Sequence, residues 1–156
     1  MSLFSSPSKR QINFGLLVLR VAIGTIFVMH GGQKLFVFGF DGVAGAFGQM
    51  GIPMPSILGP FVAFVEFFGG LGLIFGLLNR LAALGIASTM VVAILQVHLK
   101  NGFFAPTGVE LPLSLLGSTI ALAITGAGDW SFDSLLRTKV LPGKVSVDRP
   151  SLRKAA

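Results

Sequence analysis

The sequence predicts an all-α membrane protein: a bundle of four transmembrane helices with both termini in the cytoplasm. The first observation behind this fold class is composition, because the 156 residues are 53% hydrophobic and only 12% charged, with a mean hydropathy of +0.83. An ordinary soluble domain carries about twice that share of charge. The second is that four apolar stretches are long enough to approach the ~30 Å hydrocarbon core of a bilayer as helices. The third is that turn-forming segments separate these stretches.

The length of the chain indicates one membrane domain, which we expect over residues 12–133. A Ser/Pro/Lys-rich segment, 1–11, precedes it and is expected to be mobile, and a basic cytoplasmic tail, 134–156, follows it. The start of the chain lacks the apolar core and cleavage site of a signal peptide, so the first span is expected to stay in the mature protein. The transmembrane spans are predicted at 12–38, 56–78, 81–99 and 111–127.

The basic residues predict the orientation. Lys9, Arg10, Arg80 and the basic tail fall on one side of the membrane, whereas Lys34 and Lys100 fall on the other. Because lysine and arginine near span ends favour the cytoplasm, both termini are placed there. The net charge of +6 comes from these flanking residues, so it does not indicate a nucleic-acid-binding face.

Cysteine is absent from the sequence. This excludes disulfides, thiol redox chemistry, cysteine-ligated zinc and iron–sulfur clusters. The glycine clusters lack the lysine and the strand–helix context of a phosphate-binding loop, and no catalytic Ser/His/Asp arrangement stands out. No metal site is expected. Any redox role would therefore require a quinone or a cofactor on a partner.

Two charged residues are expected near the middle of the membrane. Arg20 lies about 12 Å from the cytoplasmic start of the first span, and Glu66 lies about 15 Å from the outer start of the second. Isolated charges at that depth are costly, so we predict an Arg20–Glu66 ion pair. The alternatives are that Arg20 extends toward the interface and that Glu66 is a protonated, hydrogen-bonded structural carboxyl.

A second group of polar residues is expected at the outer end of the bundle. Both histidines lie roughly 27 Å from the cytoplasmic side, because their spans run in the same direction. The candidate cluster consists of His30, Gln33, Lys34, Gln96, His98 and Glu110. Imidazole exchanges protons near neutral pH, so such a cluster would bind a polar head group or relay protons. The alternative is that the histidines are interfacial residues with no special task.

Several separated motifs occur in an order that resembles the DoxX family. They are LRVAIGTIFVMHGGQKL, GIPMP, VEFFGGLGLIFGLLNRLAA, MVVAILQVHLKNGFF, ELPLSLLG and TGAGDWSFD, and they cover about residues 16–133. The resemblance implies a small four-helix protein of the bacterial inner membrane. The polar positions that recur in the family correspond to Arg20, His30, Lys34, Glu66, Arg80, His98, Glu110 and Asp133. Phe132 replaces the leucine that is more usual before that aspartate.

The resemblance favours one function among three. The family is named for a membrane subunit associated with thiosulfate:quinone oxidoreduction, and some members are associated with soluble redox partners. It therefore implies a membrane component of an oxidoreductase system, embedded in the lipid bilayer, that binds quinone or relays protons through the outer cluster. On the residues alone, a non-enzymatic carrier or binding protein for a small hydrophobic compound or lipid fits equally. A membrane anchor that recruits soluble partners through its basic tail is the third alternative.

Overall fold

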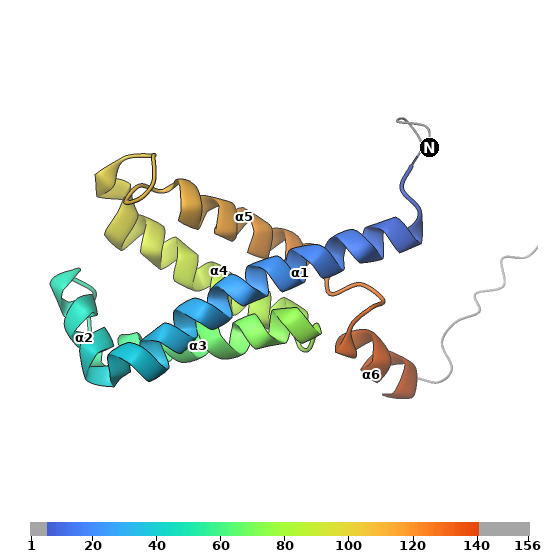
Figure 1. Cartoon of the computed structure of the whole chain (residues 1–156), viewed down its shortest axis with the longest axis horizontal. Coiled ribbons are helices and arrows are strands. Elements are labelled where there is room, and N and C mark those ends of the chain that lie inside the picture. Colours follow the sequence, from blue (N-terminus) through green and yellow to red (C-terminus); the bar gives the residue numbers. More distant parts are fainter. Residues whose placement is uncertain (1–5, 141–156) are drawn as a thin grey trace, which may run out of the picture.

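The computed structural model describes residues 6–140, and every regular element in that range is helical (Figure 1). The α-helices are α1 (Lys9–Gly32), α2 (Gly39–Gln49), α3 (Pro55–Phe75), α4 (Asn79–Ala93), α5 (Glu110–Thr125) and α6 (Phe132–Val140). A π-helical segment, η1 (Gln33–Phe38), follows α1, and the chain changes direction at Gly39, where φ is +67°, to begin α2. A second π-helical segment, η2 (Ile94–His98), and a 3₁₀ turn, η3 (Leu99–Asn101), extend α4.

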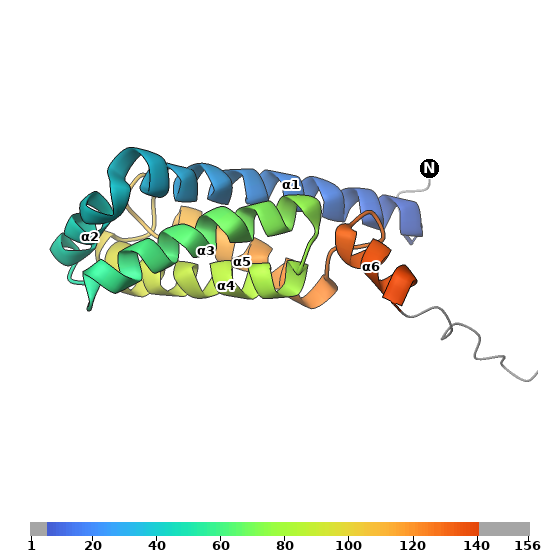
Figure 2. The same cartoon turned by 90° about the horizontal axis from the view of Figure 1, so that it is seen from below.

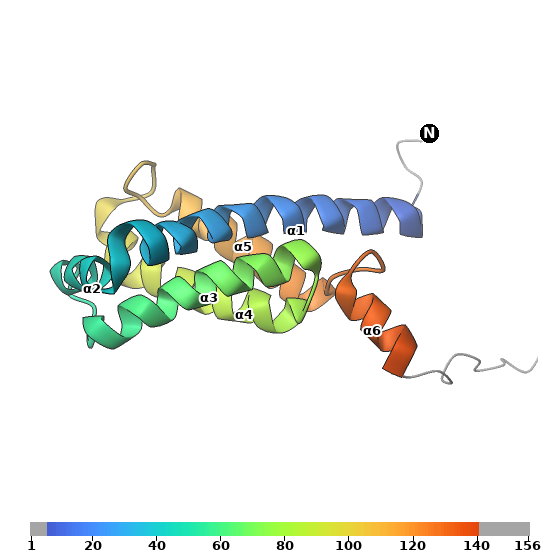
Figure 3. The same ribbon diagram turned by 60° about the horizontal axis from the view of Figure 1, so that its bottom comes forward.

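Helices α1, α3, α4 and α5 lie side by side along one long axis, as Figures 2 and 3 show. Helix α2 folds across one end of this bundle. Helix α6 lies at the opposite end, beside the start of α1. The first described residues and α6 therefore share one end of the molecule, and we name it the termini end; the other is the α2 end.

Three of the helical stretches are long and apolar enough to cross a membrane: Lys9–Gln49, Pro55–Phe75 and Asn79–Asn101. The apolar helix α5 is shorter, with 16 residues. Many large apolar side chains, such as Phe14, Phe61 and Phe68, are exposed on the outside of the bundle. An apolar exterior of this kind suits contact with lipid rather than water.

The observed helices follow the predicted spans closely, but α1 begins at Lys9, before the expected residue 12. The cause is a capping box, in which the Ser8 hydroxyl accepts from the N–H of Gln11 and the Gln11 side chain accepts from the N–H of Ser8. Residues 9–11 of the expected mobile segment thus belong to the helix. Residues 1–5 of that segment, and residues 141–156 of the basic tail, lie outside the described residues.

Helices α1 and α3 approach each other most closely at glycines. A Cβ atom on Gly70 would lie 2.7 Å from the Gly24 carbonyl oxygen, and one on Gly31 would lie 2.4 Å from the Phe67 nitrogen. Only residues without side chains permit this approach, as at many helix contacts in membranes. These glycine contacts fix the register of the two helices, so Gly24 faces Gly70 and Gly31 faces Phe67.

At the termini end, Arg20 of α1 forms hydrogen bonds with α3 and with the segment that precedes α6. Its side chain is completely buried, and its guanidinium donates to the carbonyl oxygens of Trp130, at 2.6 Å, and Leu73, at 3.5 Å. A Cβ on Gly76 would lie 1.9 Å from Arg20 Nη1, so a glycine is required beside the arginine. Carbonyl oxygens that accept from the guanidinium offset part of the cost of burying its charge.

Asp133 caps the start of α4 at the termini end. Its two carboxylate oxygens accept from the backbone N–H groups of Leu78, at 2.8 Å, and Asn79, at 2.9 Å. These N–H groups belong to the first turn of α4, where backbone donors lack partners within the helix. A residue at the start of α6 therefore caps α4, and a cap of this kind typically contributes about 1 kcal/mol.

Candidate functional site

A cavity of about 300 Å³ lies at the α2 end, between η1, α2, α3, α4 and η2. Most of its lining is apolar, from side chains such as Phe47, Phe61 and Met90. The polar residues in its wall are Lys34, Glu66, Ser88, Thr89 and His98. A concave apolar site with a few convergent polar groups is the usual form of a small-molecule site.

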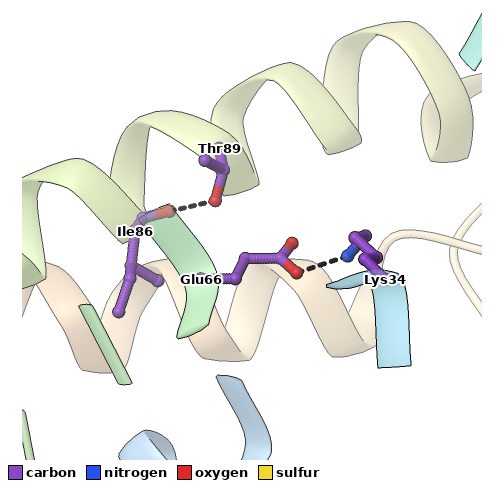
Figure 4. A network of polar contacts seen from close by, with 4 residues as sticks. All are labelled: Lys34, Glu66, Ile86 and Thr89. Atoms are coloured by element: carbon purple, nitrogen blue, oxygen red, sulfur yellow. Dashed lines mark hydrogen bonds and ion pairs between the residues drawn. The ribbon is translucent and has the colours of Figure 1, made fainter. Parts of the chain in front are cut away.

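Lys34 and Glu66 form an ion pair in the wall of this cavity (Figure 4). The Lys34 side chain is 19% exposed and that of Glu66 is 5% exposed, so the pair is largely withdrawn from solvent. Lys34 lies on η1, where the wider π-helical turn alters the direction of side chains relative to an α-helix. Each partner offsets the cost of burying the other.

His98 faces the same cavity from η2, the second π-helical segment. Its Nδ1 atom lies 2.7 Å from the carbonyl oxygen of Thr107. A carbonyl oxygen can only accept, so Nδ1 donates, and in the neutral ring Nε2 is left as an acceptor. The ring is thereby oriented by the loop between η3 and α5, and it can accept or release a proton at Nε2.

The predicted outer cluster is divided in the structure. Lys34 and His98 line the cavity. His30 and Gln33 instead face a separate, shallow groove beside Phe67, where both are exposed. Gln96 is exposed and Glu110 is half-buried at the start of α5, and neither lines the cavity. Equal depth along the membrane places residues at one level but does not place them on one face of their helices.

The predicted Arg20–Glu66 ion pair is replaced by another arrangement. Glu66 pairs with Lys34, and Arg20 donates to backbone carbonyls at the termini end. The expected depths are about 12 Å from the cytoplasmic start of the first span for Arg20 and about 15 Å from the outer start of the second span for Glu66, whereas the first span is itself about 40 Å long. More than 10 Å therefore remains between the two residues along the bundle. The Arg20 side chain does extend toward the termini end, but its guanidinium is buried against carbonyl oxygens there and is not exposed.

Sequence reasoning missed Ser88 and Thr89, which line the cavity from α4. Thr89 is buried and its hydroxyl donates to the Ile86 carbonyl one turn earlier, at 2.8 Å (Figure 4). Its oxygen keeps capacity to accept a hydrogen bond. The signal was present, because these two residues are the only hydroxyl-bearing ones in α4.

An ammonium, a carboxylate, an imidazole and two hydroxyls thus meet in the wall of an apolar cavity. These groups can hydrogen-bond the polar end of a ligand and exchange protons with it. Within residues 6–140, no group of three or more His, Asp or Glu side chains is placed to hold a metal ion.

We predict that Lys34 and Glu66 are energetically coupled and that Arg20 and Glu66 are not. In thermal unfolding of the purified protein, Lys34→Met and Glu66→Gln should each lower the free energy of unfolding. The double variant should lower it by about 1 kcal/mol less than the sum of the two single losses. The matched cycle with Arg20→Met and Glu66→Gln should be additive within about 0.5 kcal/mol. Additivity in the first cycle would contradict the observed pairing.

Comparison with known proteins identifies the family. The DoxX family model matches residues 15–99, a range that contains Lys34, Glu66 and His98. "Putative oxidoreductase CatD" of Bacillus subtilis is 34% identical over 137 residues, covering 88% of this chain and 98% of that protein. "Inner membrane protein YqjF" of Escherichia coli is 33% identical over 135 residues, covering 84% of this chain and 98% of that protein.

A third relative is "Inner membrane protein YphA" of Escherichia coli, 30% identical over 136 residues and covering 80% of this chain and 96% of that protein. No solved structure matches the chain. Its long apolar helices and these relatives make the chain a multi-pass integral membrane protein. The family model covers more than half of the chain and the first relatives align along almost their whole length, so the chain belongs to the DoxX family.

Proposed function

We propose that this protein is the membrane component of an oxidoreductase system and that its cavity binds the head group of a quinone. The observation that carries the proposal is that the Lys34–Glu66 pair and His98 line the same, mostly apolar cavity. A quinone ring is flat and apolar, and its two carbonyl oxygens accept hydrogen bonds. The Lys34 ammonium can donate to one of these oxygens, and a protonated His98 can donate from Nε2.

Reduction of a quinone to a quinol takes up two electrons and two protons. The chain has no cysteine to carry electrons, so a soluble redox partner would supply them from its own cofactor. Lys34 and His98 would supply the protons to the two carbonyl oxygens. The relative named "Putative oxidoreductase CatD" supports this class of function.

The proposed setting is the cytoplasmic membrane of a bacterium, crossed four times with both termini inside. The start of α1 and α6 share one end, which carries Lys9, Arg10, Arg80 and Arg137. This excess of basic residues favours the cytoplasmic side. Helix α5 would be the fourth span, about 24 Å long and hence slightly shorter than the hydrocarbon core. The cavity then opens near the outer surface.

A second candidate function is a carrier or binding protein for a small hydrophobic compound. The apolar lining of the cavity favours it, because such walls would hold any compact apolar molecule. The two candidates differ in whether the polar wall residues matter for binding.

The topology predicts the outcome of reporter fusions in a bacterial host. A reporter that is active only in the cytoplasm should be active when fused after Ala156, because the chain would cross the membrane an even number of times. A reporter that is active only outside should work when inserted near Asp41 or Thr107. Activity outside from the fusion at Ala156 would overturn the four-span arrangement.

The binding site predicts which variants lose quinone. With a short-chain naphthoquinone and purified protein, Lys34→Met and His98→Ala should each weaken binding about tenfold, since each removes one hydrogen bond to the ligand. The matched control His30→Ala removes the other histidine, which faces a separate groove, and should bind normally.

Equal losses for the two histidine variants would contradict the placement of the site. An analogue without carbonyl oxygens separates the two functions. If it binds as tightly as the quinone and the variants leave both affinities unchanged, the carrier function replaces the proposed one.

A further inference from the structure

A second concave site lies at the termini end, far from the cavity described above. It has a volume of about 690 Å³ and is bounded by the α3–α4 turn, the end of α5 and helix α6. We name it the arginine groove, because Arg80 of α4 and Arg137 of α6 both line it. Both side chains are exposed.

The guanidinium groups of this groove have donors to spare. Arg80 donates to the Ile124 carbonyl oxygen, at 3.3 Å, which uses one of its five N–H groups. Arg137 has no side-chain hydrogen bond or ion pair with the rest of residues 6–140. Guanidinium groups with free N–H donors can bind a phosphate in a bidentate manner.

Two carboxylates also line the arginine groove, but both accept hydrogen bonds from the protein. Asp133 accepts from the N–H groups of Leu78 and Asn79. Asp129 accepts from the Asn13 side chain, at 2.9 Å. These hydrogen bonds occupy acceptor sites of both carboxylates, so the unused donors of the groove belong mainly to the arginines.

An apolar groove continues from the arginine groove between α3 and α4. Leu78 and Leu81 line both, and every residue that lines the second groove is apolar or glycine. Its volume is about 540 Å³, and exposed phenylalanines such as Phe68 and Phe75 form its walls. We name it the α3–α4 groove. A cationic end that leads into an apolar channel on a lipid-facing surface matches the two parts of a phospholipid.

We propose that the two grooves together bind one anionic phospholipid. Its phosphate lies between Arg80 and Arg137, and one acyl chain follows the α3–α4 groove. The proposal is independent of the quinone site, which lies at the other end of the bundle. With the termini inside, the lipid belongs to the cytoplasmic leaflet, where basic pockets between helices typically recruit anionic head groups.

The test measures lipid affinity by native mass spectrometry of the purified full chain. Phosphatidylglycerol and phosphatidylcholine with identical acyl chains are compared. The wild-type protein should prefer phosphatidylglycerol about tenfold or more, and Arg80→Gln/Arg137→Gln should abolish the preference. The matched control Lys9→Gln/Arg10→Gln removes the same amount of charge from the same end of the molecule but outside the groove. It should retain the preference for phosphatidylglycerol.

A second variant tests the acyl chain. A Cβ on Gly85, which lines the α3–α4 groove, would have a single neighbour, Val65 Cγ1 at 3.4 Å, so the side chain of Gly85→Leu is expected to extend into the groove. This variant should lower the binding affinity for both lipids severalfold, while the preference for the anionic lipid remains. Circular dichroism of each variant reports whether the helices are intact.

Three outcomes would overturn the proposal. The first is that the double arginine variant still prefers phosphatidylglycerol. The second is that the lysine–arginine control loses this preference to the same extent as the double arginine variant. The third is competition by inorganic phosphate at the same concentration as the lipid, with no effect of Gly85→Leu. That result would identify a site for free phosphate rather than for a phospholipid.

Discussion

The close contact between α1 and α3 at glycines is the constraint on which the rest of the structure depends. Gly24, Gly31 and Gly70 allow backbone atoms of the two helices to touch, and this sets their register. One consequence is that Lys34, just beyond the end of α1, comes level with Glu66. Another is that Arg20 comes level with Gly76, whose missing side chain leaves room for the guanidinium. A shift by one turn would leave each of these charges without its partners in the apolar interior.

The two ends of the bundle satisfy their charges in different ways. At the termini end, carbonyl oxygens of Leu73 and Trp130 accept from Arg20, and Asp133 caps α4. All these groups are engaged in holding helices together, so this part of the interior is a structural tie. At the α2 end, the charges of Lys34 and Glu66 pair with each other in the wall of a cavity that His98 also lines. Side chains that border open space can respond to a ligand, which is why we place the function there.

Much of the fold follows from the sequence, because hydropathy marks long apolar helices and Gly/Pro segments mark their ends. In the sequence, Lys34, Glu66 and His98 stand out as polar residues of apolar spans. Their grouping in one cavity cannot be predicted from depth alone, since it depends on helix rotation, on register and on the two π-helical segments. His30 and Lys34 show the point: they are four residues apart in the sequence, yet they face different cavities. The cap of α4 by Asp133 joins residues more than fifty positions apart, beyond the reach of local patterns.

The central claim is that a quinone head group lies in the cavity between η1, α2, α3 and α4. Photo-crosslinking with an azido-quinone, followed by mass spectrometry of peptides, tests it most directly in the unmodified protein. The account predicts labels on cavity residues such as Phe47, Phe61 and Met90, which excess unlabelled quinone should suppress. Labels confined to the groove beside His30 or to the outer lipid-facing surface, unaffected by competitor, would contradict it.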